Sequence, residues 1–400
     1  RGGAVSSTNH AVEVSNCVFR GNVASGGGAI FVIDGQLTVD NSFFYRNAAD
    51  PSSSGSGGAI ATLNAPLSLT DSVFEENFAG DNAGAVNCNG NVTVSGSSFL
   101  NNHAAGNAAA LSIGNAALAT ITDTDFVGNT GGFGGAIGIN TTTSVVVASC
   151  YFEANEATDE NGGGGSISVT ADSFSLSDSE FVGNSASAGS AVQLWTVADA
   201  TVTSVTFTGN TGSAISAQGG ALVITDSTFT GNTAAGDRVS AIRIQDASSL
   251  SMSGSSFLSN DDADQGTINV KDTLLFSVTD CSFQNNNGSA ISMQGTPLQM
   301  TDCDFIGNHA ASGAAVNPGD GDHTITNCRF KNNAADLPGE PDDIFAGWGG
   351  VMAMMGANMT VINSVFEGNT AAESGGAVAA IWSTLSFVNC TFTGNTDLNG

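Results

Sequence analysis

The stretch GGAIFVIDGQLTVDNSFFYRN, residues 27–47, contains in order the three phrases that repeat along this chain. It opens with G-G-A-I, continues with a short run of alternating β-branched residues, and closes with F-x-x-N at Phe44–Asn47. The F-x-x-N phrase occurs fifteen times in 400 residues, at intervals of 22 to 36 residues. The fifteen copies begin at Phe19, Phe44, Phe74, Phe99, Phe126, Phe152, Phe181, Phe207, Phe229, Phe257, Phe283, Phe305, Phe330, Phe366 and Phe392.

A repeat period in the twenties, built from short strands and turn residues, predicts a solenoid. Gly, Ser, Thr and Val dominate, and no apolar stripe of helical spacing appears, so helical repeats are excluded. We expect an all-β parallel β-helix of about 15 coils of about 26 residues, a rod about 70 Å long. The chain is predicted to be one continuous domain, residues 1–400, with an inserted loop at 334–348 inside the interval of 36 residues.

The repeated side chains have a structural explanation in such a fold. Neighbouring coils lie about 4.8 Å apart, so each repeated residue forms a column. We predict an inward column of stacked Phe rings and an inward column of Asn amides that pass hydrogen bonds from coil to coil. Representative members of these two columns are Phe19, Asn22, Phe126, Asn129, Phe257, Asn260, Phe392 and Asn395.

The cysteines follow the same period. Six of the seven lie two residues before a repeat Phe, where other coils have mostly Ser or Thr: Cys17, Cys150, Cys281, Cys303, Cys328 and Cys390. We interpret this position as a small inward residue and the cysteines as buried free thiols. Cys281, Cys303 and Cys328 occupy successive coils, so a disulfide between two of them stays an alternative.

Charge excludes two classes of partner. The chain has 37 Asp and Glu against 8 Lys and Arg, a formal net charge of −29. Nucleic acids and anionic membrane surfaces require clustered basic residues, so neither is an expected partner. No apolar run is long enough to insert into a membrane as a helix. The chain starts without a signal peptide and neither end carries a polar cap. We therefore expect an excerpt of a longer chain, or a subunit that meets copies of itself head to tail.

The combination of F-x-x-N with G-G-A-[ILV], as at 27–30, 57–60, 134–137 and 375–378, resembles the polymorphic membrane protein repeats of Chlamydia. The resemblance covers essentially the whole chain. It implies a single-stranded right-handed parallel β-helix that is displayed outside the cell and acts as an adhesin. We therefore expect an extracellular or cell-surface structural or adhesive protein without catalysis, either a displayed passenger or a filament subunit. Its partners would be other proteins or copies of itself.

An alternative function is carbohydrate binding, or carbohydrate chemistry of the pectate-lyase-like kind, because those enzymes share the architecture. Aligned coils place Arg243 and Lys271 on one outward face, one coil apart. A stripe of basic, amide and aromatic side chains can bind and stack a sugar chain. The competing interpretation is a solvated surface whose charges pair with neighbouring Asp. The candidate residues are Arg243, Lys271, Asp246, Asp272, Gln245 and Trp195.

Acidic turns are a second kind of candidate site. Carboxylate clusters can hold Ca²⁺, although the usual loop spacing for calcium is absent, and no other cofactor is expected. The acidic turns contain Asp261, Asp262, Asp264, Asp320 and Asp322. Five glycosylation sequons, which carry weight only in a eukaryotic secreted protein, lie at Asn91, Asn140, Asn287, Asn358 and Asn389. No catalytic residue is predicted.

Overall fold

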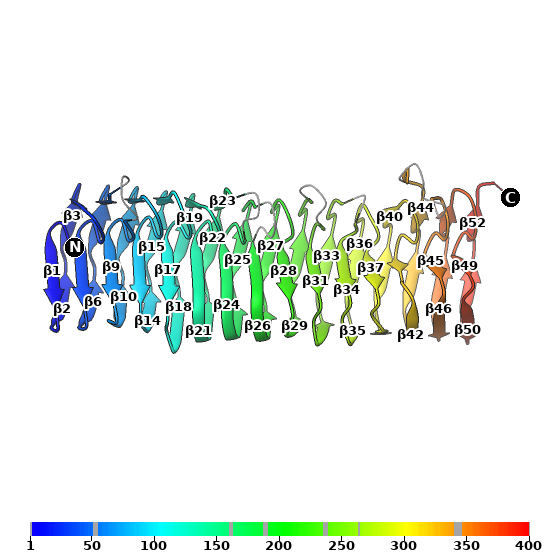
Figure 1. The fold of residues 1–400 in the computed structure, drawn as a ribbon. Coiled ribbons are helices and arrows are strands. Elements are labelled where there is room, and N and C mark those ends of the chain that lie inside the picture. The colour runs from blue at the N-terminus through cyan, green and yellow to red at the C-terminus, as the bar shows by residue number, and fades with distance from the viewer. Residues whose placement is uncertain are drawn as a thin grey trace. The chain divides into compact units, whose positions relative to one another are not determined.

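The structure, a computed structural model, describes residues 2–50, 55–159, 163–186, 191–234, 239–262, 265–339 and 346–399. Every regular element in these residues is a β-strand, and the chain divides into two compact units, Arg1–Ala200 and Thr201–Gly400. Within each unit, equivalent strands of successive coils pair in parallel (Figure 1). The predicted all-β parallel solenoid with coils of about 26 residues is confirmed.

A coil of the first unit has three main strands, one on each side, and a short fourth strand. The first-side strands follow the G-G-A phrase or the Gly and Ala residues that replace it: β1 (Val5–Thr8), β5 (Ile30–Ile33), β9 (Ile60–Leu63), β13 (Val86–Asn89) and β17 (Leu111–Gly114). The second-side strands are β2 (Ala11–Ser15), β6 (Gln36–Asp40), β10 (Leu67–Thr70), β14 (Val92–Ser95) and β18 (Leu118–Thr122). Long strands that serve both sides are β21 (Ile137–Ala148), β24 (Ile167–Ser177) and β26 (Val192–Thr203), which contains the unit boundary. The third-side strands, each with a repeat Phe, are β3 (Val18–Arg20), β7 (Phe43–Tyr45), β11 (Val73–Glu75), β15 (Ser98–Leu100), β19 (Asp125–Val127), β22 (Tyr151–Glu153) and β25 (Glu180–Val182). The fourth strands are β4 (Val23–Ala24), β8 (Ala48–Ala49), β12 (Phe78–Ala79), β16 (His103–Ala104), β20 (Thr130–Gly131) and β23 (Glu156–Ala157).

The second unit repeats this plan. Its first-side strands are β28 (Ile215–Gln218), β31 (Ile242–Gln245), β34 (Ile268–Lys271), β37 (Ile291–Gln294), β41 (Val316–Asn317), β45 (Met352–Met355) and β49 (Val378–Ile381). Its second-side strands are β29 (Ala221–Thr225), β32 (Ser249–Ser253), β35 (Phe276–Thr279), β38 (Leu298–Thr301), β42 (Gly321–Thr326), β46 (Ala357–Ile362) and β50 (Thr384–Val388). Its third-side strands are β27 (Thr206–Thr208), β30 (Thr228–Thr230), β33 (Ser256–Leu258), β36 (Ser282–Gln284), β39 (Asp304–Ile306), β43 (Arg329–Lys331), β47 (Val365–Glu367) and β51 (Thr391–Thr393). Its fourth strands are β40 (His309–Ala310), β44 (Ala334–Ala335), β48 (Thr370–Ala371) and β52 (Thr396–Asp397).

The corners between these sides depend on residues that tolerate the left-handed backbone region. In one coil Asp34 follows the first side, Asn41 follows the second side, and Arg46 follows the third side, with φ of 52°, 43° and 51°. Asn and Asp accept this conformation better than other non-Gly residues, because their short polar side chains bond locally. The frequent Asn, Asp and Gly of the sequence are therefore explained by the corners.

The Phe column forms the stacked ladder that the sequence predicts. Within each unit, successive ring centroids lie 4.4–5.2 Å apart with interplanar angles of 2–21°. Phe126 and Phe257 are fully buried, whereas Phe19 is half-buried and Phe392 is 44% exposed, because each of these two has a stacked ring on one face only. The buried rings supply a large apolar area to the core.

The Asn column satisfies its polar atoms within the core. Within each unit, the Nδ2 of one Asn donates to the Oδ1 of the next Asn over 2.8–3.1 Å. At Asn129 the same Nδ2 also donates to the backbone oxygen of Phe99, and the backbone N–H donates to Asn155 Oδ1. Asn129 and Asn260 are fully buried, and Asn22 and Asn395 are half-buried.

The cysteine position lies beside the Phe ladder, and all seven cysteines are free thiols. The predicted burial is confirmed for four of the six: Cys150, Cys281, Cys303 and Cys328. It is wrong for Cys17, which is exposed, and Cys390 is half-buried. The Cys150 Sγ donates to the carbonyl of Ala148, two residues earlier, as the hydroxyl of Ser179 does to Ser177. Burial raises the pKa of Cys150 to about 12 and that of Cys88 to about 11, because the thiolate is poorly solvated inside the core. The structure therefore places unbridged small thiols at this position, with no disulfide among the described cysteines.

The predicted insertion at 334–348 has ends that belong to the coil. Ala334 and Ala335 form β44, which pairs with β40 and β48, and Trp348 forms a bridge to Ser374. The inserted segment is thus shorter than predicted, because an interval of 36 residues does not reveal where pairing stops. Residues 340–345 lie outside the described residues.

Candidate functional site

The outward side chains of the first-side strands in the second unit form a polar column. Parallel register places Gln218, Gln245, Lys271 and Gln294 side by side on β28, β31, β34 and β37. Lys271 is exposed, and Gln245 is half-buried. This column presents amide and ammonium donors on four successive coils.

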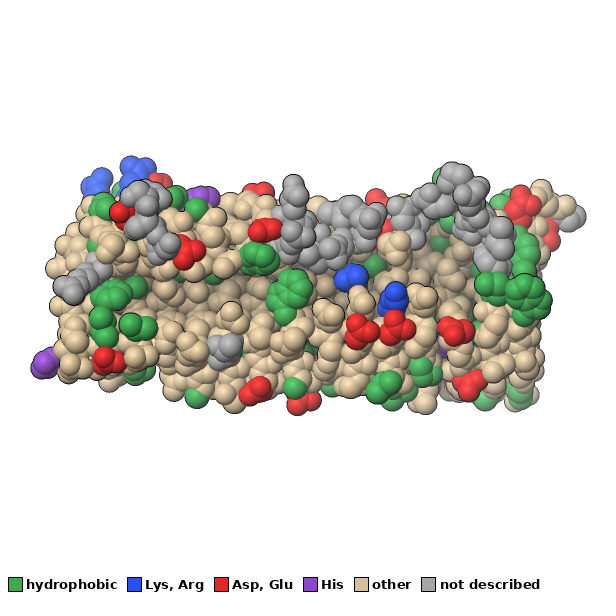
Figure 2. Space-filling view, viewed as in Figure 1, with side chains coloured by type: hydrophobic (Ala, Val, Ile, Leu, Met, Phe, Trp, Pro, Cys, Tyr) green, Lys and Arg blue, Asp and Glu red, His purple; other side chains and the backbone are tan. Residues whose placement is uncertain are grey.

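Arg243 lies on the same outward face as Lys271, but in the adjacent column, opposite Asn269. Its guanidinium Nη2 donates to Gln245 Oε1 over 3.3 Å. Arg243 and Lys271 are therefore one coil apart along the structure and two residues apart in register. On the face drawn in Figure 2, basic side chains are few, and they lie close to acidic side chains.

Asp246 and Asp272 occupy the corner that follows these strands. Both are exposed, with φ of 55° and 50°. The Asp246 N–H donates to the Lys271 carbonyl, and the Asp272 N–H donates to the Gln294 carbonyl. Their identity is explained by the corner, since Asp is favoured at positive φ.

Trp195 belongs to the first unit, where it lies on β26. It is half-buried, and its indole Nε1 donates to Ser168 Oγ over 3.2 Å. Trp195 lines a cleft of about 370 Å³ together with residues of the first-side strands β17, β21 and β24. The sequence identified this tryptophan but not the cleft, whose floor consists of small residues. Ser112 and Gly138 are small residues that pair in register on neighbouring coils, and this was the sequence pattern that could have indicated the cleft.

The acidic turns do not converge in the described residues. Asp261 Oδ1 accepts a hydrogen bond from Asn287, and the Asp262 Oδ1 accepts one from the Gln265 N–H. Asp322 Oδ1 accepts one from Asn358, while Asp320 lines a second cleft of about 420 Å³ with Gln294 and Met355. Among the residues that the structure describes, no three His, Cys, Asp or Glu side chains are placed to hold a metal ion. Asp264 lies outside them, and the Ca²⁺ expectation stays a prediction that calcium titration can test.

The sequon residues differ in their surroundings. Asn91, Asn140, Asn358 and Asn389 are exposed, and Asn287 is half-buried. The amide of Asn287 donates to Asp261, and that of Asn389 donates to Asn363 over 3.3 Å. Asn91 Oδ1 accepts from two backbone N–H groups, those of Ala117 and Leu118.

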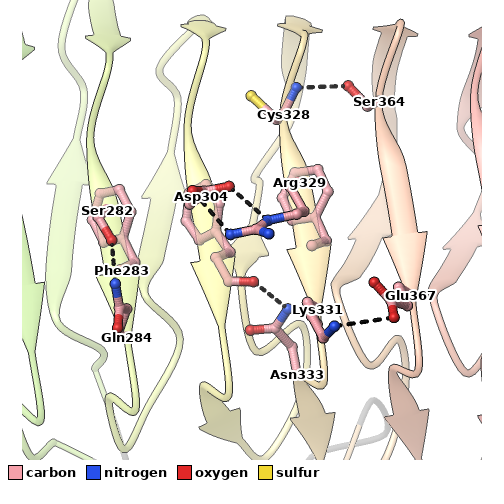
Figure 3. A network of polar contacts seen from close by, with 12 residues as sticks. Ser282, Phe283, Gln284, Asp304, Cys328, Arg329, Lys331, Asn333, Ser364 and Glu367 are labelled. Atoms are coloured by element: carbon pink, nitrogen blue, oxygen red, sulfur yellow. Dashed lines mark hydrogen bonds and ion pairs between the residues drawn. The ribbon is translucent and has the colours of Figure 1, made fainter.

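Surface charges on the third side pair across coils. Arg329 on β43 contacts Asp304 on β39 through two hydrogen bonds of 2.9 and 3.2 Å, and Lys331 contacts Glu367 over 3.0 Å (Figure 3). All four groups are partly exposed, so each pair contributes little to stability. These contacts explain why several of the few basic residues are where they are.

Comparison with known proteins agrees with the coil geometry. A family model described as "right handed beta helix region" matches residues 190–337 and 240–398, which together span just over half of the chain. The chain therefore belongs to the right-handed β-helix family. The Chlamydia polymorphic membrane protein repeat matches residues 16–33, so the chain carries a repeat of a surface-protein family.

More distant similarities are also found. A stretch of 157 residues is 31% identical to the metabotropic glutamate receptor-like protein R of Dictyostelium discoideum, covering 39% of this chain and 8% of that protein. The tailspike protein of E. coli bacteriophage HK620, solved with a hexasaccharide, has a TM-score of 0.37 and 13% identity, over 96% of this chain and 72% of its own. A pentasaccharide complex of that tailspike has a TM-score of 0.28 and 12% identity, over 91% and 66%. The described residues contain no helix of the length and apolarity that a membrane span requires.

Proposed function

We propose that this chain is a non-catalytic structural or adhesive β-helix displayed on a cell surface. The observation that carries the proposal is the surface-protein repeat at residues 16–33, which recurs along the chain as F-x-x-N and G-G-A phrases. In each copy of the repeat, the inward Phe and Asn residues belong to core columns. The polar atoms of these Asn side chains form hydrogen bonds within the core. Contacts with a partner therefore fall to the outward side chains and the loops.

The hydrogen bonds and corner positions of the outward polar groups support a role without catalysis. The Arg243 guanidinium donates to a neighbouring Gln, and Asp246 and Asp272 form corners. In a lyase of the pectate type a base and carboxylates would have to converge on a substrate. The geometry of these groups is explained by the coil itself, which favours a structural role.

Carbohydrate binding on the Arg243 and Lys271 face is the second candidate. The column of Gln218, Gln245, Lys271 and Gln294 favours it, because four successive coils present hydrogen-bond donors at the spacing of the strands. A pectate-lyase-like activity on the same face is the enzymatic form of this alternative.

Three experiments test the proposal. Antibodies against the chain are expected to label intact source cells without permeabilisation, and labelling only after permeabilisation would overturn the surface assignment. Beads coated with the chain should adhere to target cells, and the chain should release no product from a panel of polysaccharides. Turnover that disappears in Arg243→Ala/Lys271→Ala, with the far-UV circular dichroism unchanged, would establish the enzymatic alternative instead.

Partners of the protein class are tested by sedimentation. We expect either a monomer that binds a foreign protein or copies that associate end to end. Sedimentation velocity of the chain alone at rising concentration separates these two, since self-association raises the sedimentation coefficient without any added partner.

A further inference from the structure

The cleft beside Trp195 has a neutral lining. The chain has 37 acidic residues, yet none of the described residues that line this cleft is charged. Its lining combines two aromatic rings, Trp195 and Phe133, with amides and hydroxyls such as Asn82, Asn107 and Thr170. A concave site with an aromatic surface and a few polar groups is the usual form of a small-ligand site.

The fold creates the hollow where a corner is lost. In earlier coils a positive-φ residue, such as Asn64 or Asn115, divides the first-side from the second-side strand. β21 and β24 run through this position as strands of 12 and 11 residues. Their register also shifts between Ile139 and Thr142, next to Asn140, which lines the cleft. Irregularities of this kind in a sheet often lie beside functional sites.

The floor of the cleft is kept low by small residues. Ser112, Gly138 and Ser168 pair in register across three successive coils. In the earlier coils of the same unit, small and larger residues alternate at this position: Ser6, Phe31, Ala61 and Asn87. A Cβ at Gly138 would lie 2.9 Å from the Cβ of Ala108, so this position has no room for a side chain.

The indole of Trp195 is held in place. Its N–H donates to Ser168 Oγ, which ties the ring to the floor while the ring lines the cleft. A ring fixed in this way loses little conformational entropy when a ligand packs against it. The apolar face of a sugar ring fits such a surface, while the sugar hydroxyls reach the amides and hydroxyls around it.

The cleft also continues along the same side of the unit. A neighbouring hollow of about 340 Å³, distinct from the cleft at Asp320, shares Ser112 and Asn140 with the Trp195 cleft. Phe31 and Asn87 also line this hollow. Together they extend over several coils, which fits a chain of sugars better than a single ring.

Other ligand classes fit less well. A cationic ligand would lack a carboxylate, and an anionic one would lack a basic group, among the described lining residues. A peptide strand cannot be added to the sheet here, because Ile137 pairs with Leu111 on one side and Ile167 on the other. Recognition must use side chains, which again favours hydroxyl-rich neutral molecules.

We propose that this cleft binds a neutral oligosaccharide, with Trp195 stacked on one sugar ring. The inference rests on the adhesive role proposed above and names its ligand class. It places carbohydrate binding in an uncharged cleft of the first unit and not on the face of Arg243 and Lys271.

The test uses the whole chain and its own tryptophan. In a Trp348→Phe/Trp382→Phe background, titration with neutral hexasaccharides (gluco-, manno-, galacto- and N-acetylglucosamine-based) is expected to change the Trp195 fluorescence for at least one of them. On the wild-type background, Trp195→Ala and Ser112→Gln should each weaken that binding about tenfold or more, equal to about 1.4 kcal/mol. Trp382→Ala, at an indole that is 86% exposed in the second unit, and Ser292→Gln, on the outward face of β37, are the matched controls that should not change it.

The outcomes separate the cleft from the proposed function. No binding across a neutral glycan array, binding unaffected by Trp195→Ala and Ser112→Gln, or selective binding of polygalacturonate or heparin fragments would each overturn the cleft assignment. Surface labelling and bead adhesion that persist in Trp195→Ala would leave the adhesive role intact and remove the cleft from it. Trp195-dependent binding by a chain that is absent from the cell surface would overturn the proposed function alone.

Discussion

Replacing Asn260 by alanine isolates the contribution of one member of the Asn ladder. The Oδ1 of Asn260 accepts two hydrogen bonds from Asn232, one from the backbone N–H over 3.1 Å and one from the side-chain Nδ2 over 3.0 Å. The Nδ2 of Asn260 donates to the carbonyl of Phe229 and to Asn286 Oδ1, both over 3.0 Å. The alanine side chain can replace none of these four contacts.

The magnitude follows from the groups that lose a partner. Two N–H donors of Asn232, which is fully buried, would be left without an acceptor. Each such buried donor costs about 1–3 kcal/mol, so the two together cost about 2–6 kcal/mol. The Phe229 carbonyl also loses a donor, which places the expected loss in the upper half of this range.

The assay is guanidinium denaturation followed by far-UV circular dichroism, with amide hydrogen exchange to locate the loss. Repeat proteins unfold in segments, so the exchange of Asn232 and its neighbours is expected to rise most. Asn269→Ala is the matched control, because Asn269 is outward on β34 and its amide makes one long contact of 3.5 Å among the described residues. It should change the unfolding free energy by less than about 0.5 kcal/mol. Equal losses in the two variants would refute the argument that the Asn column stabilises the coil through buried hydrogen bonds.

Three further outcomes follow from the same structure. Phe257→Ala should lower the unfolding free energy by about 3–5 kcal/mol, because the ring is fully buried between two stacked neighbours; an unchanged melting temperature would contradict the ladder. Burial raises the pKa of Cys150 to about 12, above the usual value of about 8.5 for a cysteine. As the pH rises, the unfolded chain therefore loses this proton before the folded chain does. The free energy of unfolding is expected to fall as the pH rises from about 8.5 toward 12. Cys150→Ser should make the denaturation midpoint less dependent on pH in that window, and parallel slopes would count against the burial argument. Arg329→Ala should cost less than about 1 kcal/mol, and less still in 0.5 M NaCl, since its pair with Asp304 is partly exposed; a larger, salt-independent loss in thermal unfolding would show a different role.

The columns could be predicted from the sequence because the same residue recurs at the same place in each coil. The Phe and the Asn of the phrase are three residues apart in every copy, as at Phe257 and Asn260. Assigning these two residues to the inward face therefore predicts the orientation of all fifteen rings and all fifteen amides. The cysteine column followed from its offset of two residues from the Phe. These features depend on spacing within a phrase, which is constant even where the coil length changes.

The candidate sites could be predicted less well, because they depend on residues that differ between coils. The sequence placed Arg243 and Lys271 on one face, and the structure adds that Gln245, not Arg243, stands beside Lys271. The cleft at Trp195 was missed because it results from absent bulk at Ser112 and Gly138 and from a lost corner. Neither feature creates a motif.

The Asn ladder bridges coils of very different length without changing its geometry. The bond from Asn210 to Asn232 spans 22 residues and that from Asn333 to Asn369 spans 36, yet the donor–acceptor distances are 2.9 and 3.0 Å. The ladder therefore keeps the same geometry across a short and a long interval. Evolution can therefore lengthen, shorten or replace a loop in one copy without disturbing the core of the next. A surface protein built in this way can diversify what it shows to its surroundings while its scaffold is inherited unchanged.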